Sequence, residues 1–402
     1  MKKVNVGIVG IGNMGSAHAK NIFEGKVEGL ELQAVCDLAA GKLGWAEEHL
    51  PGVTRYRDYH EMFATEALEA VIIAVPHPLH PVVAKDAFAA GFHVLTEKPA
   101  GIDVASVREM NEAAEKSGKV FCIMYNQRTN PLFARLREMV AEGVLGEIKR
   151  MSWTVTNWYR TQHYYDSGDW RATWSGEGGG VMMNQCPHNL DIWQWILGVP
   201  SSVRAFCRCG RYHQIDVEDD VTLYATYPNG ATATFITSTG EYPGTNRLEV
   251  CGTLGKVVVE NKTLKWYRLS KDEREICATE TKNTSREPVE YSEITQENKE
   301  KAHLGILRNF ANAILHGEKL ISPGSEGIYG VSMINAAYLS DWTGRAVSLP
   351  LSAEDEALYG KLLKEKQDAE QNSEDTRKKE CVQEFQTARQ TGAYEERWDV
   401  RW

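Results

Sequence analysis

Short apolar runs alternate with amphipathic segments over the first 120 residues of the chain. The run Ala70–Val75 is apolar throughout, as expected for a parallel strand that is covered on both faces. Helix-like segments such as Ser16–Phe23, His80–Ala90 and Val104–Ser117 lie between such runs. This alternation predicts an α/β domain with a doubly wound parallel sheet over residues 1–125. Its predicted strands are Val4–Val9, Leu30–Cys36, Ala70–Val75, His93–Thr96 and Lys119–Met124.

The pattern changes after residue 125 to longer strands with alternating polarity, joined by turns such as Pro228-Asn229-Gly230. A helix following Pro131 precedes them. We expect a second, α+β domain with a large open, mainly antiparallel mixed sheet over residues 126–352. Residues 353–402 are highly charged and predict an exposed helical extension, whose Trp398 and Trp402 dock on a neighbouring subunit. The predicted strands of the second domain include Ile148–Val155, Asp220–Tyr227, Ala231–Ser238 and Arg247–Cys251.

Composition narrows the class of protein. The formal net charge of −10 argues against a nucleic-acid-binding surface. No run approaches the roughly 18 apolar residues of a membrane-spanning helix, and the N-terminus lacks the pattern of a signal peptide. Eight irregularly spaced cysteines form no disulfide framework. We expect a cytoplasmic protein of two or three domains, with neither nucleic acid nor membrane as a partner.

A glycine-rich segment, GIGNMG at residues 10–15, follows the first predicted strand and precedes a helix. Glycines in this pattern permit a tight turn, close approach to a pyrophosphate and packing of helix on strand. An acid, Asp37, ends the second strand, where a carboxylate binds the adenosine ribose and repels a 2′-phosphate. The segment therefore predicts binding of NAD rather than NADP. The predicted cofactor residues here are Gly10, Gly12, Asn13, Met14, Gly15 and Asp37.

Polar residues gather where open α/β sheets bind ligands, after the carboxyl ends of strands. Val75, Pro76, His77 and His80 follow the third predicted strand, and Glu97 and Lys98 follow the fourth. A distant segment begins with GGG at residues 178–180. If it forms one helix, three of its side chains share a face at i, i+4 and i+7 and could complete an acid/base site with Lys98. These are Asn184, His188 and Asp191.

These motifs resemble the Gfo/Idh/MocA family, the glucose–fructose oxidoreductase and inositol dehydrogenase type of NAD(P)-dependent sugar enzyme. Glu97-Lys98-Pro99 matches the family's EKP motif, and residues 178–191 match its GGGxLxDxGxHxxD segment. Tyr125-Asn126-Gln127-Arg128, Trp170-Arg171 and Ser348–Pro350 also fit. The resemblance covers residues 1 to about 350. It implies a Rossmann domain, a mixed-sheet domain, and pairing into homodimers or homotetramers through that sheet.

The resemblance also implies that Lys98 and His188 are the acid/base groups at the reacting hydroxyl of a sugar, polyol or glycoside. The family's first aspartate in the helix motif is Asn184 here, which can position a hydroxyl but cannot take its proton. Asp191 is then expected to orient the imidazole of His188. The expected substrate residues are Asn126, Arg160, His163, Tyr164, Arg171, Asn184 and Asp191, and Val75, Pro76, His77, His80, Glu97, Lys98 and Gln127 are expected to contact the cofactor.

Other interpretations stay open. Lys98 could be an ordinary strand-end lysine and His188 a buried core histidine, since a largely apolar helix surrounds it. His77 and His80 form an HxxH pair, but a zinc site needs further ligands, and we expect no metal. The function could also be an NAD-assisted glycosidase or lyase that acts through a transient keto-sugar, or a non-catalytic sensor of sugar and NAD. An aromatic cluster suits sugar stacking, a subunit interface or core packing about equally; it comprises Trp153, Trp158, Tyr159, Tyr164, Tyr165, Trp170 and Trp174.

Overall fold

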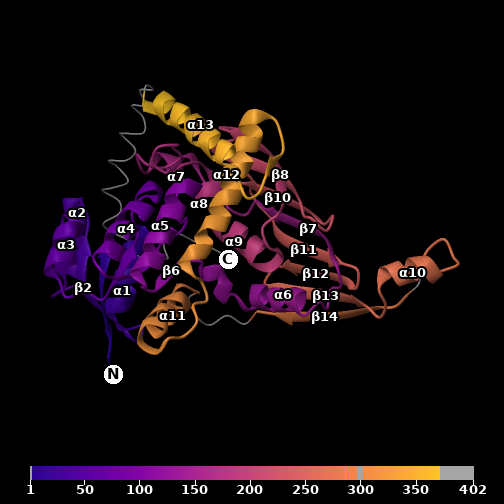
Figure 1. Cartoon of the computed structure of the whole chain (residues 1–402), viewed down its shortest axis with the longest axis horizontal. Helices are drawn as coiled ribbons and strands as arrows, with labels where there is room; N and C mark the ends of the chain where they lie inside the picture. The colour runs from indigo at the N-terminus through magenta and orange to yellow at the C-terminus, as the bar shows by residue number, and fades with distance from the viewer. Residues whose placement is uncertain (1, 286, 297–301, 372–402) are drawn as a thin grey trace.

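Two β-sheets organise the chain, and each is covered by helices (Figure 1). The structure is a computed structural model that describes residues 2–285, 287–296 and 302–371. The six-stranded sheet has the order β3-β2-β1-β4-β5-β6, and its strand pairs are parallel throughout. Its strands are β1 Val4–Val9, β2 Leu30–Cys36, β3 Thr54–Tyr56, β4 Ala70–Ile73, β5 His93–Thr96 and β6 Phe121–Ile123.

This order reverses at β1, which pairs with β2 on one side and β4 on the other. Helices cover both faces of the sheet, so the β4 residues Ala70–Ile73 are completely buried. One of the covering helices is distant in sequence: α11 packs its Leu304, Leu307 and Phe310 into the same core as β1. The elements here are α1 Asn13–Phe23, α2 Ala40–His49, α3 Tyr59–Thr65, η1 His77–Leu79, α4 His80–Ala89, α5 Val104–Ser117 and α11 Ala302–His316.

The nine-stranded sheet has the order β14-β13-β12-β11-β7-β10-β9-β8-β15. Within it β7 and β10 run parallel and the other neighbours antiparallel, which confirms the predicted mainly antiparallel mixed sheet. Its strands are β7 Ile148–Val155, β8 Ser202–Cys209, β9 Glu218–Thr226, β10 Thr232–Ser238, β11 Asn246–Gly252, β12 Gly255–Glu260, β13 Thr263–Leu269, β14 Val289–Thr295 and β15 Val347–Ser348.

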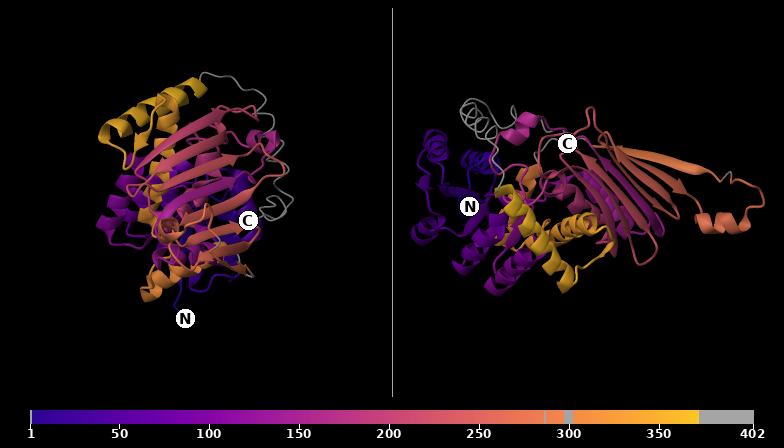
Figure 2. Two further views of the ribbon diagram at one scale, coloured as in Figure 1. Left: turned by 90° about the vertical axis from the view of Figure 1, so that its right-hand side faces the viewer. Right: turned by 90° about the horizontal axis from the view of Figure 1, so that it is seen from above.

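Helices α6 (Pro131–Ala141), α9 (Pro187–Leu197) and α12 (Gly327–Thr343) gather on one face of this sheet (Figure 2). Within the described ranges no helix covers the opposite face, where Tyr224 and Ile236 are exposed. No described helix is both long and apolar enough to span a membrane. The short elements are η2 Asn126–Thr129, α7 Gln162–Asp166, α8 Val181–Asn184, α10 Glu273–Thr279 and η3 Gly324–Glu326.

The predicted C-terminal extension begins as a helix, α13 (Ala353–Gln371), but this helix is not simply exposed. Tyr359 and Leu363 bury one face of it, and the ring of Tyr359 stacks on that of Trp342 at 5.6 Å. The Tyr359 hydroxyl donates to the carbonyl of Ile102 at 3.0 Å. The helix is therefore part of the folded body. Trp398 and Trp402 lie outside the described residues.

We expect Tyr359→Ala to lower the free energy of unfolding by about 3 kcal/mol, because a buried aromatic ring and its hydrogen bond are lost together. Urea unfolding of the full chain measures this loss. The matched control is Lys361→Ala on the exposed side of α13, which should change the stability by no more than about 0.5 kcal/mol. Equal midpoints for Tyr359→Ala and the unmodified chain would show that α13 does not pack in solution.

Candidate active site at the junction of the two sheets

The glycine-rich loop joins β1 to α1 at the edge where the strand order reverses. A Cβ on Gly15 would lie 1.8 Å from the Gly10 carbonyl oxygen, so packing alone requires glycine there. A Cβ on Gly12 would meet only the Lys42 amine, at 3.9 Å. Gly12 thus leaves the surface beside the start of α1 clear, and α1 has no side-chain cap. This loop fits the pyrophosphate of a dinucleotide.

Asp37 lies beside this loop. One carboxylate oxygen accepts from the Ile11 N–H at 2.9 Å and the other from the Ala39 N–H at 2.9 Å. The Lys42 ammonium lies 3.3 Å from the same carboxylate. Lys42 was not among the predicted residues; it supplies a cation in the first turn of α2.

Lys98 follows β5 and reaches across to the second domain. Its Nζ donates to the main-chain carbonyl of Asn184 at 3.1 Å. Burial lowers the pKa of the Lys98 amine below its usual value; the charges of Arg171 and Arg160 act in the same direction, and those of Glu97 and Glu177 oppose it. A lysine in this setting releases its proton more readily than one in water.

His188 lies in the first turn of α9. Burial lowers the pKa of its imidazole well below the usual value, and the charge of Lys98 adds to the effect. The imidazole is therefore neutral near pH 7 and close enough to Lys98 to sense its charge. The ring of Tyr125 meets it edge-on at 6.3 Å.

Residues 184–191 do not form the single helix on which the i, i+4 and i+7 spacing depended. The helix α8 ends at Asn184, and α9 begins at Pro187. Asp191 also departs from its expected role, because its carboxylate is taken by the Arg128 guanidinium at 2.6 and 2.8 Å and by the Gln194 amide at 2.9 Å. Asp191 is buried in this ion pair, and the hydrogen bonds of its carboxylate go to Arg128 and Gln194 rather than to His188.

Three of the expected substrate residues meet at the hydroxyl of Tyr164. It accepts from the Arg171 guanidinium at 2.9 Å and from the Asn184 amide at 3.3 Å. The amide of Gln185 approaches the same oxygen at 3.2 Å. The guanidinium of Arg160 lies 5.0 Å from the Tyr164 ring centre. His163, in contrast, is exposed on α7.

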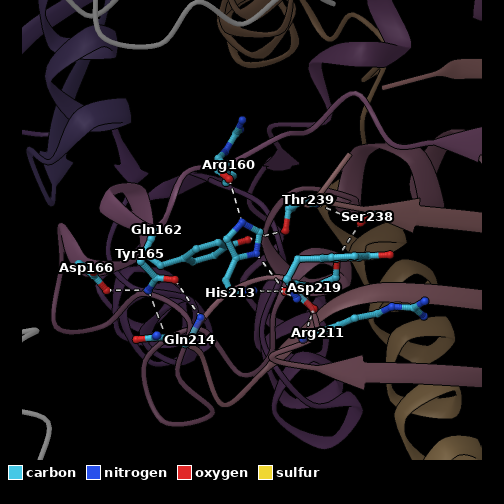
Figure 3. Close-up of polar contacts among 12 residues, drawn as sticks. Arg160, Gln162, Tyr165, Asp166, Arg211, His213, Gln214, Asp219, Ser238 and Thr239 are labelled. Carbon is cyan, nitrogen blue, oxygen red and sulfur yellow. Dashed lines mark hydrogen bonds and ion pairs between the residues drawn. The ribbon is translucent and has the colours of Figure 1, made fainter. Parts of the chain in front are cut away.

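The loop that carries Arg160 is held by a buried pair that the sequence did not reveal, His213 and Asp219 (Figure 3). The His213 ring donates to the Asp219 carboxylate at 2.9 Å and to the carbonyl of Arg160 at 2.8 Å. Both partners are acceptors, so the ring carries both protons. Burial acts to lower the pKa of His213, but its hydrogen bonds to Asp219 and Arg160 outweigh that effect and the pKa is raised.

Glu97 and the predicted cofactor histidines have protein partners. The Glu97 carboxylate accepts from the His18 ring at 2.7 Å. Burial acts to raise the pKa of Glu97, but the hydrogen bond and charge of His18 bring it down to about 2. The ring nitrogens of His80 contact the carbonyls of Pro99 and Val75 at 2.7 and 2.8 Å, and His77 contacts the carbonyl of Glu177 at 2.9 Å. Of the predicted residues near the end of β6, Gln127 is buried, and the Asn126 amide contacts the His303 ring at 2.9 Å.

Two family profiles match the two domains of this chain. The profile "Oxidoreductase family, NAD-binding Rossmann fold" matches residues 4–125, and the profile "GFO/IDH/MocA C-terminal domain" matches residues 133–258. The chain belongs to the Gfo/Idh/MocA family. It therefore contains a NAD-binding Rossmann domain, as the glycine-rich loop and Asp37 predicted.

Relatives of this Gfo/Idh/MocA protein include sugar and polyol enzymes. The myo-inositol 2-dehydrogenase of Thermotoga maritima is 22% identical over 86% of this chain and 98% of its own length. An uncharacterized oxidoreductase of Bacillus subtilis, YrbE, is 25% identical over 65% of this chain and 74% of its own. Alignments with some other curated relatives span only about half of their length.

A solved structure resembles nearly the whole described fold. The WlbA dehydrogenase of Chromobacterium violaceum, crystallised with NADH and UDP-GlcNAcA, is 28% identical and has a TM-score of 0.74. The similarity covers 88% of this chain and 97% of that one. This similarity extends beyond residue 258, at which the family profile of the second domain ends.

We expect Asp37→Ala to weaken NAD binding by roughly tenfold or more, because a charged acceptor for the ribose hydroxyls is removed. It should also narrow the preference for NAD over NADP, since Lys42 then faces a 2′-phosphate without an opposing carboxylate. Titration of both cofactors by fluorescence measures the two effects. Glu47→Ala, on the exposed side of α2, is the matched control. Equal or better use of NADP by the unmodified protein would contradict the predicted preference.

Proposed function

We propose that the protein is a NAD-dependent oxidoreductase that transfers a hydride between the nicotinamide and the carbon that bears a secondary hydroxyl of a sugar, polyol or glycoside. In this proposal Lys98 and His188 are the acid/base groups. The observation that carries it is the half-buried Lys98, whose amine donates to the Asn184 carbonyl and whose charge acts on His188. Bound NAD supplies the acceptor for the hydride.

Oxidation of a secondary alcohol requires a base for the hydroxyl proton. Lys98 serves as that base when its amine is neutral, and burial together with two nearby arginines favours the neutral form. His188 is a neutral imidazole that can accept or donate at the same hydroxyl. The Asn184 carbonyl fixes the direction of the Lys98 amine, so the proton acceptor is placed before the substrate binds.

Aromatic and arginine side chains support a ring-shaped polar substrate. Tyr164 and Trp170 both lie under the guanidinium of Arg171, at 4.5 and 4.7 Å. The names of relatives, among them myo-inositol 2-dehydrogenase, point to the same class of substrate. The open face of the nine-stranded sheet supports assembly into a homodimer or homotetramer, because Phe206, Tyr224 and Ile236 are exposed there.

We expect Lys98→Ala and His188→Ala each to lower kcat by roughly 10²–10⁴-fold, the usual contribution of a positioned proton transfer. NAD affinity should change little, because the glycine-rich loop and Asp37 hold the dinucleotide. NADH formation is measured with a panel of monosaccharides, inositols and glycosides. Lys119→Ala and His316→Ala are matched controls away from the site.

Full turnover in His188→Ala would remove this residue from the mechanism. Loss of NAD binding in Lys98→Ala would make the lysine a cofactor-site residue without an acid/base role. Release of free sugar without accumulation of NADH would favour the glycosidase or lyase alternative. Absence of turnover with every compound, together with intact NAD binding, would favour the sensor.

We further expect kcat/KM for alcohol oxidation to rise with pH through the lowered pKa of Lys98, since the protonated amine cannot act as base. The rise should therefore occur below the usual range of lysine titration. Lys98→Arg, which stays protonated, should abolish this limb of the profile. A profile that is unchanged in Lys98→Arg would assign the limb to another group.

A further inference from the structure

A buried carboxylate that no sequence motif marked lies beside Lys98 and Asn184. The Glu177 side chain is 1% exposed, and its carboxylate accepts from the side-chain amide of Asn184. The other oxygen accepts from the Ala172 N–H at 2.8 Å. Glu177 directly precedes the GGG segment, so the chain turns back from it into α8.

Residues 178–191 resemble the motif GGGxLxDxGxHxxD, and Asn184 occupies the position of its first aspartate. We propose that Glu177 is a positioning residue, which supplies next to Lys98 the carboxylate that this chain lacks at position 184. The proposal rests on the proposed oxidoreductase function. Glu177 holds the Asn184 side chain, and the main-chain carbonyl of the same residue holds the Lys98 amine. One carboxylate thus fixes both the direction and the electrostatic environment of the base.

The charges around Lys98 support this assignment. Two carboxylates act on it, Glu97 and Glu177, and two guanidinium groups oppose them, Arg160 and Arg171. Glu97 is already bound to His18, and Arg171 lies 3.8 Å from the Glu177 carboxylate. The charge of Lys98 also acts to lower the pKa of four neighbouring groups, His77, His80, Cys186 and His188.

The other buried acids nearby bind different groups and do not contact the Asn184 side chain in the described part of the chain. Asp191 is the second acid of the motif, but Arg128 and Gln194 occupy its carboxylate. Glu218 is also buried, yet it binds the N–H groups of Gly180 and Met182 and the hydroxyl of Tyr338. Glu177 is the acid that contacts the Asn184 side chain in the described part of the chain.

A charge-exchange cycle tests the proposal on the full chain with saturating NAD. In Glu177→Gln a negative charge near Lys98 is lost, so the rising limb of kcat/KM should move to lower pH and kcat should fall roughly tenfold to hundredfold. In Asn184→Asp a second negative charge is added, so the limb should move to higher pH. The double variant Glu177→Gln/Asn184→Asp restores one carboxylate and should return the limb towards its original position. Asp169→Asn, an exposed acid of the same loop, is the matched control and should leave the profile unchanged.

Coinciding profiles for Glu177→Gln and the unmodified enzyme would overturn the proposal. So would a double variant whose limb stays with that of Glu177→Gln. If Glu177→Gln does not fold, Asn184→Asp still tests the proposal. A limb that does not move to higher pH in Asn184→Asp would contradict the role of charge at this position.

A spectroscopic titration separates this proposal from the proposed function. The chain is labelled with 13C at the lysine ε carbon, and the Lys98 signal is assigned from its absence in Lys98→Arg. Its titration should move to lower pH in Glu177→Gln and to higher pH in Asn184→Asp. Such shifts without turnover of any sugar would retain the role of Glu177 and reject the proposed reaction. Turnover without such shifts would reject the role of Glu177 alone.

Discussion

The geometry of the candidate site depends on the buried ion pair between Arg128 and Asp191. Arg128 lies on η2, just after the last strand of the first sheet, and Asp191 lies one turn after His188 on α9. The guanidinium also donates to Glu326 at 2.6 Å, so three distant segments meet at one side chain. Burial acts to lower the pKa of Arg128, but the charges of Asp191 and Glu326 outweigh it and the pKa is raised. Removing one partner of such a pair typically costs about 3–5 kcal/mol. This contact joins the segment after β6 to helix α9, which carries His188.

Two neighbouring acids on β9 then fix the parts of the site that belong to the second domain. Successive residues of a strand point to opposite sides, so the side chains of Glu218 and Asp219 lie on opposite sides of β9. Glu218 accepts from the N–H groups of Gly180 and Met182, which places α8 and the carbonyl that Lys98 contacts. Asp219 accepts from N–H groups of residues 211–213 and from the His213 ring, which holds the loop of Arg160. The nine-stranded sheet therefore serves as a platform that orients two loops over the edge of the first sheet.

Local patterns were sufficient to predict the parallel sheet and the NAD-binding Rossmann domain, because both depend on residues close together in sequence. The contacts of the site depend on residues that are far apart. Arg128 and Asp191 are separated by 63 positions, and neither local periodicity nor a motif pairs them. The break between α8 and α9 did carry a signal, since Pro187 occupies the first turn of a new helix. Strand β3 was missed because its three residues, TRY, are mostly polar and exposed at a sheet edge.

The burial of helix α13 could not be predicted from its charged composition alone, because it depends on the spacing of its few apolar residues. Its charged residues suggested an exposed tail, yet Tyr359 and Leu363 are four residues apart and share the buried face. Near the end of the same helix, the Glu370 carboxylate accepts from the Trp174 N–H and from the N–H and hydroxyl of Ser175, the latter two at 2.9 Å. Trp174 and Ser175 lie between Arg171 and Glu177, so a charged residue of the C-terminal helix supports the loop that brings these two side chains to Lys98. Charge on this helix is thus part of the framework of the site, because the loop of residues 171–177 links α13 to the surroundings of Lys98.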